Sequence, residues 1–303
     1  MVSLAVLILT FNEERHIARA LESVAPFASE VFVIDCFSTD RTVEIARSLG
    51  AVVLSHAWVS HARQFQWGLD NAPITADWIM RLDADEVVEP DLADEILGKL
   101  PGLAADITGV DLRRGHIFLG RWIRHGGRYP LILTRIWRRG QGRIEDRWMD
   151  EHIVVRQGRT VLFDAPFFDH NLNDLSFFTA KHNGYATREA ADVLGRRYGL
   201  FREGLDLSRE ASPRHASVKR FIKDHMYNRL PFPVAALGYF LFRYIGQLGF
   251  LDGREGMVYH VLQGCWYRFL VGAKVLEFDR SIRLLPTVEE KRAALARLTG
   301  LPL

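Results

Sequence analysis

Apolar runs alternate with helical segments throughout the first 83 residues, and this alternation constrains the fold more than any other feature of the chain. The apolar runs cover residues 2–9, 30–36, 51–55 and 77–83. The segments between them show the helical spacing of apolar residues and end at Pro26, Gly50 and Pro73. Strands that alternate with helices predict an α/β fold built on a parallel, doubly wound sheet.

Polar clusters lie at the ends of three of these apolar runs. They are TFNEE at 10–14, DCFSTD at 35–40 and LDADE at 82–86. Ligands of open parallel sheets bind beyond the carboxyl ends of the strands, so the three clusters are expected to meet at one edge of the sheet. Their convergence predicts a binding site at that edge.

The third cluster concentrates negative charge. Asp83, Asp85, Glu86 and Glu89 lie within seven positions, and carboxylates this close repel one another unless a positive charge lies among them. One interpretation is a D-x-D pair, Asp83 and Asp85, that holds Mg²⁺ or Mn²⁺ against the diphosphate of a nucleotide sugar, because hard oxygen ligands suit these ions. The alternative is a solvated acidic turn at the start of the helix expected after Glu89.

The motifs LTFNEE, VIDCFSTDRT and RLDADE, in this order, resemble those of the inverting glycosyltransferases of family 2, which have the GT-A fold. The resemblance implies a Rossmann-like nucleotide-diphospho-sugar transferase that uses a divalent cation, Mg²⁺ or Mn²⁺. The implied nucleotide-sugar-binding residues are Thr10, Asn12, Glu13, Asp35 and Asp83. The implied metal ligands are Asp85 and Asp83, with Asp85 preferred as the direct ligand.

Two positions depart from the family pattern. Cys36 stands where many members carry a second acid, and Phe37 stands where glycine is usual. The contact with the base is therefore expected to differ in detail. We interpret Cys36 as a small packed residue rather than a reactive thiol.

An inverting transfer needs a general base that takes the proton of the acceptor hydroxyl. The segment RWMDEHIVV at 147–155 is the candidate, because apolar neighbours raise the pKa of a carboxyl group. Related sequences often show a His-Glu pair in this register, so the resemblance favours Glu151, with Asp150 as the second candidate. The alternative is a charge pair between strands that involves a nearby arginine.

A narrower resemblance extends over nearly the whole chain. The segments FLGRWIRHGGRYP, RWMDEHI, KHNGYATREA and GFLDGREG are similar to a subgroup that acts in lipopolysaccharide core and exopolysaccharide assembly, including core glucosyltransferases. This implies transfer of a hexose, glucose from UDP-glucose, to a lipopolysaccharide core or lipid-linked oligosaccharide. The alternatives are a polyprenyl-phosphate sugar synthase on the same fold and a non-catalytic, membrane-associated nucleotide-binding protein.

Positive charge dominates the rest of the chain. The first 100 residues hold 16 acidic and 7 basic side chains, whereas the remaining residues hold 21 and 32. Guanidinium groups bind phosphates, and we expect His116, Arg124, His125 and Lys181 to contact the acceptor or a phosphate. The alternative is a solvated basic face. The basic part of the chain contains no recognisable nucleic-acid-binding motif, so no nucleic acid partner is expected.

We expect three parts in the chain. Residues 1–100 would form the nucleotide-sugar-binding half of the GT-A domain, 101–172 the acceptor-binding and catalytic half with mixed or antiparallel strands, and 173–303 a helical region. The apolar stretches 231–251 and 257–278 predict amphipathic elements lying on a membrane surface. A transmembrane hairpin and burial against the catalytic domain are the alternatives.

The expected location is the cytoplasm, at the inner face of the cytoplasmic membrane. The chain has two cysteines, Cys36 and Cys265, which is typical of a reducing compartment. Its first residues lack the basic region and cleavage site of a signal peptide.

Overall fold

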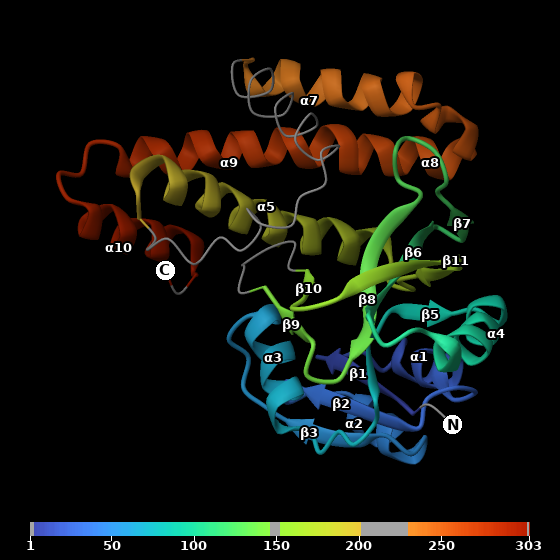
Figure 1. Cartoon of the computed structure of the whole chain (residues 1–303). Helices are drawn as coiled ribbons and strands as arrows, with labels where there is room; N and C mark the ends of the chain where they lie inside the picture. Colours follow the sequence, from blue (N-terminus) through green and yellow to red (C-terminus); the bar gives the residue numbers. More distant parts are fainter. Residues whose placement is uncertain (1–2, 146–151, 201–229, 302) are drawn as a thin grey trace. The chain divides into compact units, whose positions relative to one another are not determined.

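The computed structural model describes residues 3–145, 152–200, 230–301 and 303 (Figure 1). The chain divides into two compact units, residues 1–172 and residues 173–303. Each unit has its own cluster of buried apolar side chains. The separation of roles between 1–100 and 101–172 within the first unit remains a prediction.

The first unit is built on a mixed sheet whose strands follow the order β3-β2-β1-β4-β8-β6-β11-β5. Its parallel part consists of β1 (Leu4–Thr10), β2 (Glu30–Asp35), β3 (Val52–Ser55) and β4 (Trp78–Asp83). These are the four strands expected from the apolar runs, and their parallel pairing is confirmed. Thr10 and Asp35 are paired in the register of β1 and β2, so the first two polar clusters begin side by side.

The second half of the sheet is mixed, as the sequence predicted. Here β8 (Leu131–Arg138) is antiparallel to both β4 and β6 (Ile107–Phe118), β11 (Arg159–Asp169) is parallel to β6, and β5 (Glu86–Val88) is antiparallel to β11. The short strand β7 (Arg121–Trp122) pairs with β6. The strands β9 (Gly142–Ile144) and β10 (Ile153–Val155) form a separate antiparallel pair.

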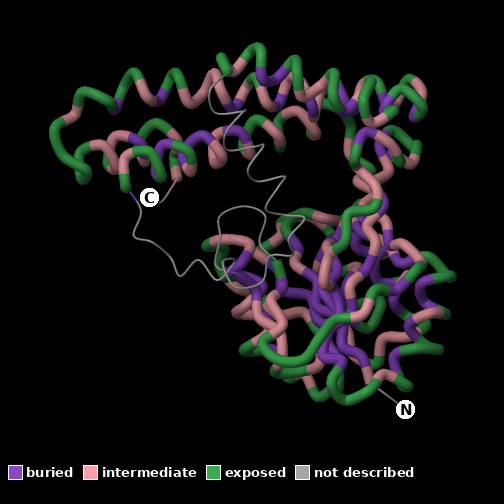
Figure 2. The backbone as a smooth tube through the Cα atoms, turned by 45° about the horizontal axis from the view of Figure 1, so that its top comes forward, coloured by how far each residue is buried: buried purple, intermediate pink, exposed green. Residues whose placement is uncertain are grey.

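Helices cover both faces of the parallel strands. Successive side chains of a strand point to opposite faces, so each strand contributes to two separate buried clusters. Leu4, Val6 and Ile8 of β1 lie in one buried cluster, and Ala5 and Leu7 lie in another. The first cluster includes residues of α1 (Ile17–Val24), α2 (Thr42–Ser48) and α4 (Pro90–Lys99), and the second includes residues of α3 (His61–Asn71). A short 3₁₀ turn, Leu100–Gly102, follows α4. Figure 2 shows the buried backbone concentrated in these strands.

The described part of the second unit is helical. It contains α5 (Leu175–Tyr198), α7 (Phe232–Leu241), α8 (Gly253–Tyr259), α9 (Tyr267–Ile282) and α10 (Val288–Thr299). Between them lie the π-helical segments η4 (Phe242–Gly246) and η6 (His260–Trp266) and the 3₁₀ turn η5 (Gly249–Asp252). Helix α5 is capped at both ends: the Asp174 side chain accepts the Phe177 N–H at its start, and Gly199 ends it with φ +62°.

Among the described residues, no single helix has the length and apolar character needed to cross a membrane. One pair of helical segments, Phe232–Gly246 and Gly249–Ile282, meets those criteria when its two parts are taken together, and the pair is bent by 74°. The pair covers most of the two apolar stretches predicted from the sequence.

Candidate functional site

The loops that follow β1 and β2 are joined through the carboxylate of Asp35. Thr10 donates its hydroxyl to Asp35 Oδ1 at 2.9 Å. Ser38 donates its backbone N–H to Oδ2 at 2.8 Å and its hydroxyl to Oδ1 at 2.5 Å. Asp35 is buried, and these bonds satisfy its carboxylate within the protein. The Asp35 side chain therefore shapes the predicted nucleotide pocket by holding two loops together.

Asn12 and Glu13 join the same two loops from the β1 side. The Asn12 N–H donates to Ser38 Oγ at 2.9 Å, and its side-chain oxygen accepts the Thr39 N–H at 2.8 Å. The Glu13 N–H donates to Thr42 Oγ1 at 2.7 Å, after β2, and the Glu13 carboxylate lies 2.6 Å from Nδ1 of buried His16. The structure thus brings Thr10, Asn12, Glu13 and Asp35 into one junction, and their direct contact with a nucleotide remains a prediction.

Exposed aromatic side chains follow each of three neighbouring strands at this edge. Phe11 after β1 is 57% exposed, Phe37 after β2 is 62% exposed and Trp58 after β3 is 47% exposed. Phe37 has φ +56°, a left-handed backbone conformation that favours glycine. That conformation gives a physical reason for the glycine that is usual at this position. None of these aromatic residues was predicted from the sequence to belong to the site.

Asp83, the last residue of β4, is paired with two arginines. Its Oδ1 lies 3.2 Å from Arg81 Nε, and its Oδ2 lies 3.4 Å from Arg135 Nη2. Burial by itself would raise the pKa of Asp83, but the charges of Arg81 and Arg135 outweigh it and hold that pKa well below its ordinary value. The positive charge that the acidic cluster requires is therefore supplied, at Asp83, by the protein.

Glu86 closes the turn that contains the D-x-D pair. Its Oε2 accepts the Asp83 N–H at 2.9 Å, and its Oε1 lies 2.6 Å from Arg135 Nη2. Glu86 is 1% exposed and Arg135 is 3% exposed. Burial raises the pKa of Glu86 to about 8, against the opposing charge of Arg135 and with the support of the negative charge on Asp83.

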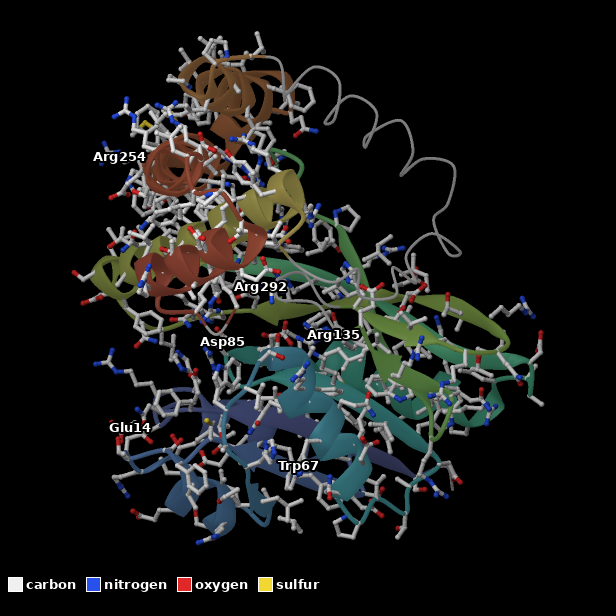
Figure 3. All side chains as sticks on the ribbon, turned by 90° about the vertical axis from the view of Figure 1, so that its left-hand side faces the viewer. Glu14, Trp67, Asp85, Arg135, Arg254 and Arg292 are labelled. Atoms are coloured by element: carbon white, nitrogen blue, oxygen red, sulfur yellow. The ribbon has the colours of Figure 1, made fainter. Side chains whose placement is uncertain are left out.

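Asp85 lies in the turn between β4 and β5, beside the chain that leaves β11. The Asn171 side-chain N–H donates to Asp85 Oδ2 at 2.9 Å, and the His170 N–H donates to the Asp85 carbonyl at 2.9 Å. Arg19 of α1 donates to the His170 carbonyl at 2.6 Å. Figure 3 labels Asp85 and Arg135 among the side chains of the first unit.

A further ion pair lies where β6 and β11 run side by side. Asp169 Oδ2 lies 3.1 Å from His116 Nδ1 and 3.4 Å from Arg114 Nη2. Arg114 Nη1 also lies 3.7 Å from Glu86 Oε1. Burial lowers the pKa of His116, although Asp169 opposes that shift. Close contacts thus connect Asp83 to His116 through Arg135, Glu86, Arg114 and Asp169.

For the remaining predicted residues we describe no contact with the D-x-D turn or with Asp35. Arg124 lies over the ring of Trp122, with its guanidinium carbon 3.8 Å from the ring centroid, and the His125 carbonyl accepts the Arg128 N–H. Lys181 lies on α5 in the second unit. Glu151 and Asp150 lie outside the described residues, so the choice of general base remains a prediction.

Sequence reasoning did not identify Arg135, Arg19 or Asn171. Arg135 lies inside an apolar strand segment, which gives no signal of a functional partner. The DHNL segment, Asp169–Leu172, directly follows a strand in the same way as the three polar clusters. The strand-end rule, applied to β11 as well as to the first four strands, would have drawn attention to Asn171.

Polar loops at the carboxyl ends of parallel strands, with a D-x-D turn among them, define a ligand-binding α/β domain. Residues 5–172 match the model of glycosyl transferase family 2, and the chain belongs to that family. This membership and the mixed sheet agree with a GT-A-like α/β fold, and they support an enzyme of the glycosyltransferase type.

Similar proteins cover parts of the chain. An uncharacterized glycosyltransferase of Rickettsia typhi is 41% identical over 96 residues, which is 32% of each chain. An uncharacterized glycosyltransferase of Rickettsia bellii is 44% identical over 89 residues, or 29% of this chain and 30% of the relative. The matched part thus spans about a third of the length of these relatives. A solved structure of glucosyl-3-phosphoglycerate synthase from Mycobacterium tuberculosis with Mn²⁺, UDP and glucosyl-3-phosphoglycerate is 23% identical, with a TM-score of 0.32, and the match covers 38% of this chain and 44% of that one.

Proposed function

We propose that this chain is a metal-dependent inverting glycosyltransferase that moves a hexose, glucose from UDP-glucose, to a bacterial envelope glycan. The acceptor would be a lipopolysaccharide core or a lipid-linked oligosaccharide. The observation that carries the proposal is the meeting of the Asp35 junction and the D-x-D turn at the carboxyl ends of β2, β1 and β4. A nucleotide diphosphate laid across these strand ends reaches both features.

The donor set at the D-x-D turn suits Mg²⁺ or Mn²⁺. Among the described residues, no group of three or more His, Cys, Asp and Glu side chains is arranged to hold a metal ion. Mg²⁺ is commonly bound through one or two carboxylates together with substrate phosphates, a requirement that Asp85 can meet. When bound, such an ion would neutralise the charge that develops on the departing diphosphate. Asp83, already paired with Arg81 and Arg135, is better suited to accept hydrogen bonds from the donor.

The exposed aromatic residues support a binding surface for the base and sugar of the donor. Phe11 and Phe37 follow β1 and β2 on either side of the Asp35 junction. Aromatic faces stack on bases and on the apolar faces of sugars at little entropic cost. Thr10, Asn12 and Asp35 would then set the shape of the pocket, because their own bonds hold its two loops together.

The transfer requires one displacement at the anomeric carbon. The acceptor oxygen forms its bond to that carbon while the bond to the diphosphate breaks, and the acceptor proton passes to a carboxylate. Glu151, or Asp150 in its place, is the proposed base. His116, Arg124, His125 and Lys181 are the proposed acceptor or phosphate contacts.

The second unit supports attachment to the inner face of a membrane. Five apolar side chains of α7 and η4, here called the α7 face, are each 42–58% exposed and recur at helical spacing: Val234, Leu237, Leu241, Phe242 and Ile245. Arg243 is the one charged residue between 231 and 251. Basic residues are frequent in the sequence that precedes residue 231. An apolar segment that follows a basic one in the sequence is typical of helices that lie on anionic lipid.

The enzymatic proposal is tested by UDP release from UDP-glucose, with Mn²⁺ and a lipopolysaccharide core acceptor. We expect release in the wild type and losses of at least a hundredfold in Asp85→Ala and in Glu151→Gln. Full activity in both variants would refute the assigned roles. A product that is a polyprenyl monophosphate sugar would favour the synthase, and UDP binding without turnover would favour the non-catalytic alternative.

Membrane attachment is tested by flotation with vesicles that contain anionic lipid. Each half-buried leucine or isoleucine contributes about 1 kcal/mol, so the double variant Leu237→Ser and Ile245→Ser should reduce partitioning more than tenfold. Leu284→Ser is the matched control, since Leu284 is exposed between α9 and α10 and lies outside the α7 face. Equal flotation of all three proteins would contradict the proposed surface.

A further inference from the structure

The DHNL segment, Asp169–Leu172, connects three parts of the first unit through consecutive residues. Asp169 is paired with His116 and Arg114. His170 and Asn171 contact the D-x-D turn at Asp85, and the Leu172 N–H donates to His16 Nε2 at 2.9 Å. The segment thus joins the predicted acceptor side, the acidic turn and the first helix.

Backbone pairing brings this segment to Asp85. Asp169 is paired with Glu86 in the register of β11 and β5. The bond from the His170 N–H to the Asp85 carbonyl continues that pairing by one residue. The next side chain along the segment, Asn171, then reaches Asp85 Oδ2 at 2.9 Å. The sheet therefore determines which side chain meets the Asp85 carboxylate.

Two anchors hold the segment in this position. Arg19 donates to the His170 carbonyl at 2.6 Å, and its other terminal nitrogen lies 3.0 Å from His170 Nδ1. His16 is buried and is held by Glu13 through Nδ1 while Nε2 accepts the Leu172 N–H. Both anchors come from the start of the chain, so they join the TFNEE cluster to the loop that carries Asn171.

We infer that Asn171 is a positioning residue for Asp85 and that it orients this carboxylate toward the divalent cation of the donor. The inference rests on the proposed function. A carboxylate that binds a metal is commonly held by a second hydrogen-bonding group, and loss of that group typically lowers metal affinity by about ten- to a hundredfold. The amide of Asn171 can hold the carboxylate without adding charge, so it does not compete with the cation.

A bond that only secured the loop would have a different consequence. Its loss would lower thermal stability and would weaken the binding of UDP equally with and without metal. A positioning role predicts that UDP binding in EDTA is unchanged, whereas Mn²⁺ binding in the presence of UDP is weakened. The two roles are therefore separated by a measurement that does not require turnover.

The experiment titrates Mn²⁺ into the full chain with saturating UDP and follows the electron paramagnetic resonance signal of free Mn²⁺. Asn171→Ala should bind Mn²⁺ at least tenfold more weakly than the wild type, with UDP affinity in EDTA unchanged by calorimetry. Asn171→Leu keeps the branched shape of the side chain and removes the N–H donor, and it serves if the alanine variant does not fold. Asn71→Ala is the matched control, because the exposed Asn71 amide bonds the Trp67 carbonyl within α3.

The outcomes separate this inference from the proposed function. Wild-type protein that binds neither UDP nor Mn²⁺ with UDP would refute the proposed function itself. Wild-type binding together with Mn²⁺ affinities in Asn171→Ala and Asn171→Leu equal to that of the wild type would overturn the positioning role alone. Equal weakening in Asn71→Ala would overturn it as well.

Discussion

Replacing Glu86 with glutamine should remove most of the pH dependence of stability that arises from the D-x-D turn. Glu86 is a buried carboxyl group whose pKa is raised from the ordinary value of 4.5 to about 8, chiefly by burial and against the charge of Arg135. Glutamine has nearly the same shape and does not titrate. The comparison of Glu86→Gln with the wild type therefore isolates the proton bound at this position.

The sign of the effect follows from the raised pKa of Glu86. Between pH 4.5 and about 8 the folded protein holds a proton at Glu86 that the unfolded chain has released. Stability therefore falls as pH rises through this window, by about 1.4 kcal/mol per pH unit at its steepest. Between pH 5 and pH 7 the wild type should lose about 2.5 kcal/mol through this group. That loss is a large fraction of a typical free energy of unfolding.

The assay is urea unfolding of both proteins in EDTA at several values between pH 5 and pH 8. The glutamine amide N–H would lie near the Asp83 N–H or the Arg135 guanidinium, both of which now donate to Glu86. We therefore expect a constant offset in the free energy of unfolding between the two proteins at every pH. The informative quantity is how that offset changes: it should shift by about 2.5 kcal/mol between pH 5 and pH 7 in favour of the variant. Glu22→Gln, exposed on α1, is the control and should follow the wild type. Parallel curves for Glu86→Gln and the wild type would refute the assignment of a proton to Glu86.

Three further substitutions test the loops and the buried ion pairs. Arg135→Met should lower the free energy of unfolding at pH 7 by about 3 kcal/mol, because it removes one of the two arginine partners of the Asp83 carboxylate and the hydrogen bond that Arg135 donates to the buried Glu86 side chain; a loss below 1 kcal/mol in urea unfolding would contradict this. Phe37→Gly should leave the melting temperature unchanged or raise it, since glycine removes a left-handed strain of about 1 kcal/mol, while calorimetry should show weaker UDP binding if the ring stacks on the donor. Asp35→Asn should destabilise the chain by about 2 kcal/mol, because an amide donor would then face the Ser38 N–H or hydroxyl; equal urea midpoints would contradict the role given to its carboxylate.

The four parallel strands and the polar residues at their ends could be predicted because both depend on local sequence pattern alone. Each of the first four apolar runs became a parallel strand, and the residues TFNEE and DCFSTD meet through the bonds of Asp35 and Asn12. Periodicity and the positions of proline and glycine were sufficient for that part of the fold. The same reasoning located the D-x-D turn but left open which positive charge accompanies it.

The identity of those charges depends on strands far apart in sequence. Arg135 reaches Asp83 and Glu86 from β8, 52 and 49 positions away, and Asn171 reaches Asp85 from 86 positions away. A sequence pattern gives no signal for Arg135, which only sheet registration brings to the turn. The strand-end position of Asn171 marks it as a candidate but does not identify Asp85 as its partner. The roles of Asp150 and Glu151 remain predictions because those residues lie outside the described part of the chain.

By itself, the sequence determined the alternation of strands and helices, the edge at which polar residues gather and the family to which the motifs point. It could do so because strand and helix periods and strand-end positions are properties of short segments. Only the tertiary structure decided that Asp83 is balanced by arginines, that Glu86 is buried against Arg135 and that Asn171 holds Asp85. The physical reason is that electrostatic environment depends on burial and on distances of a few ångströms between groups, which the mixed sheet creates by placing β4, β5, β8 and β11 in contact.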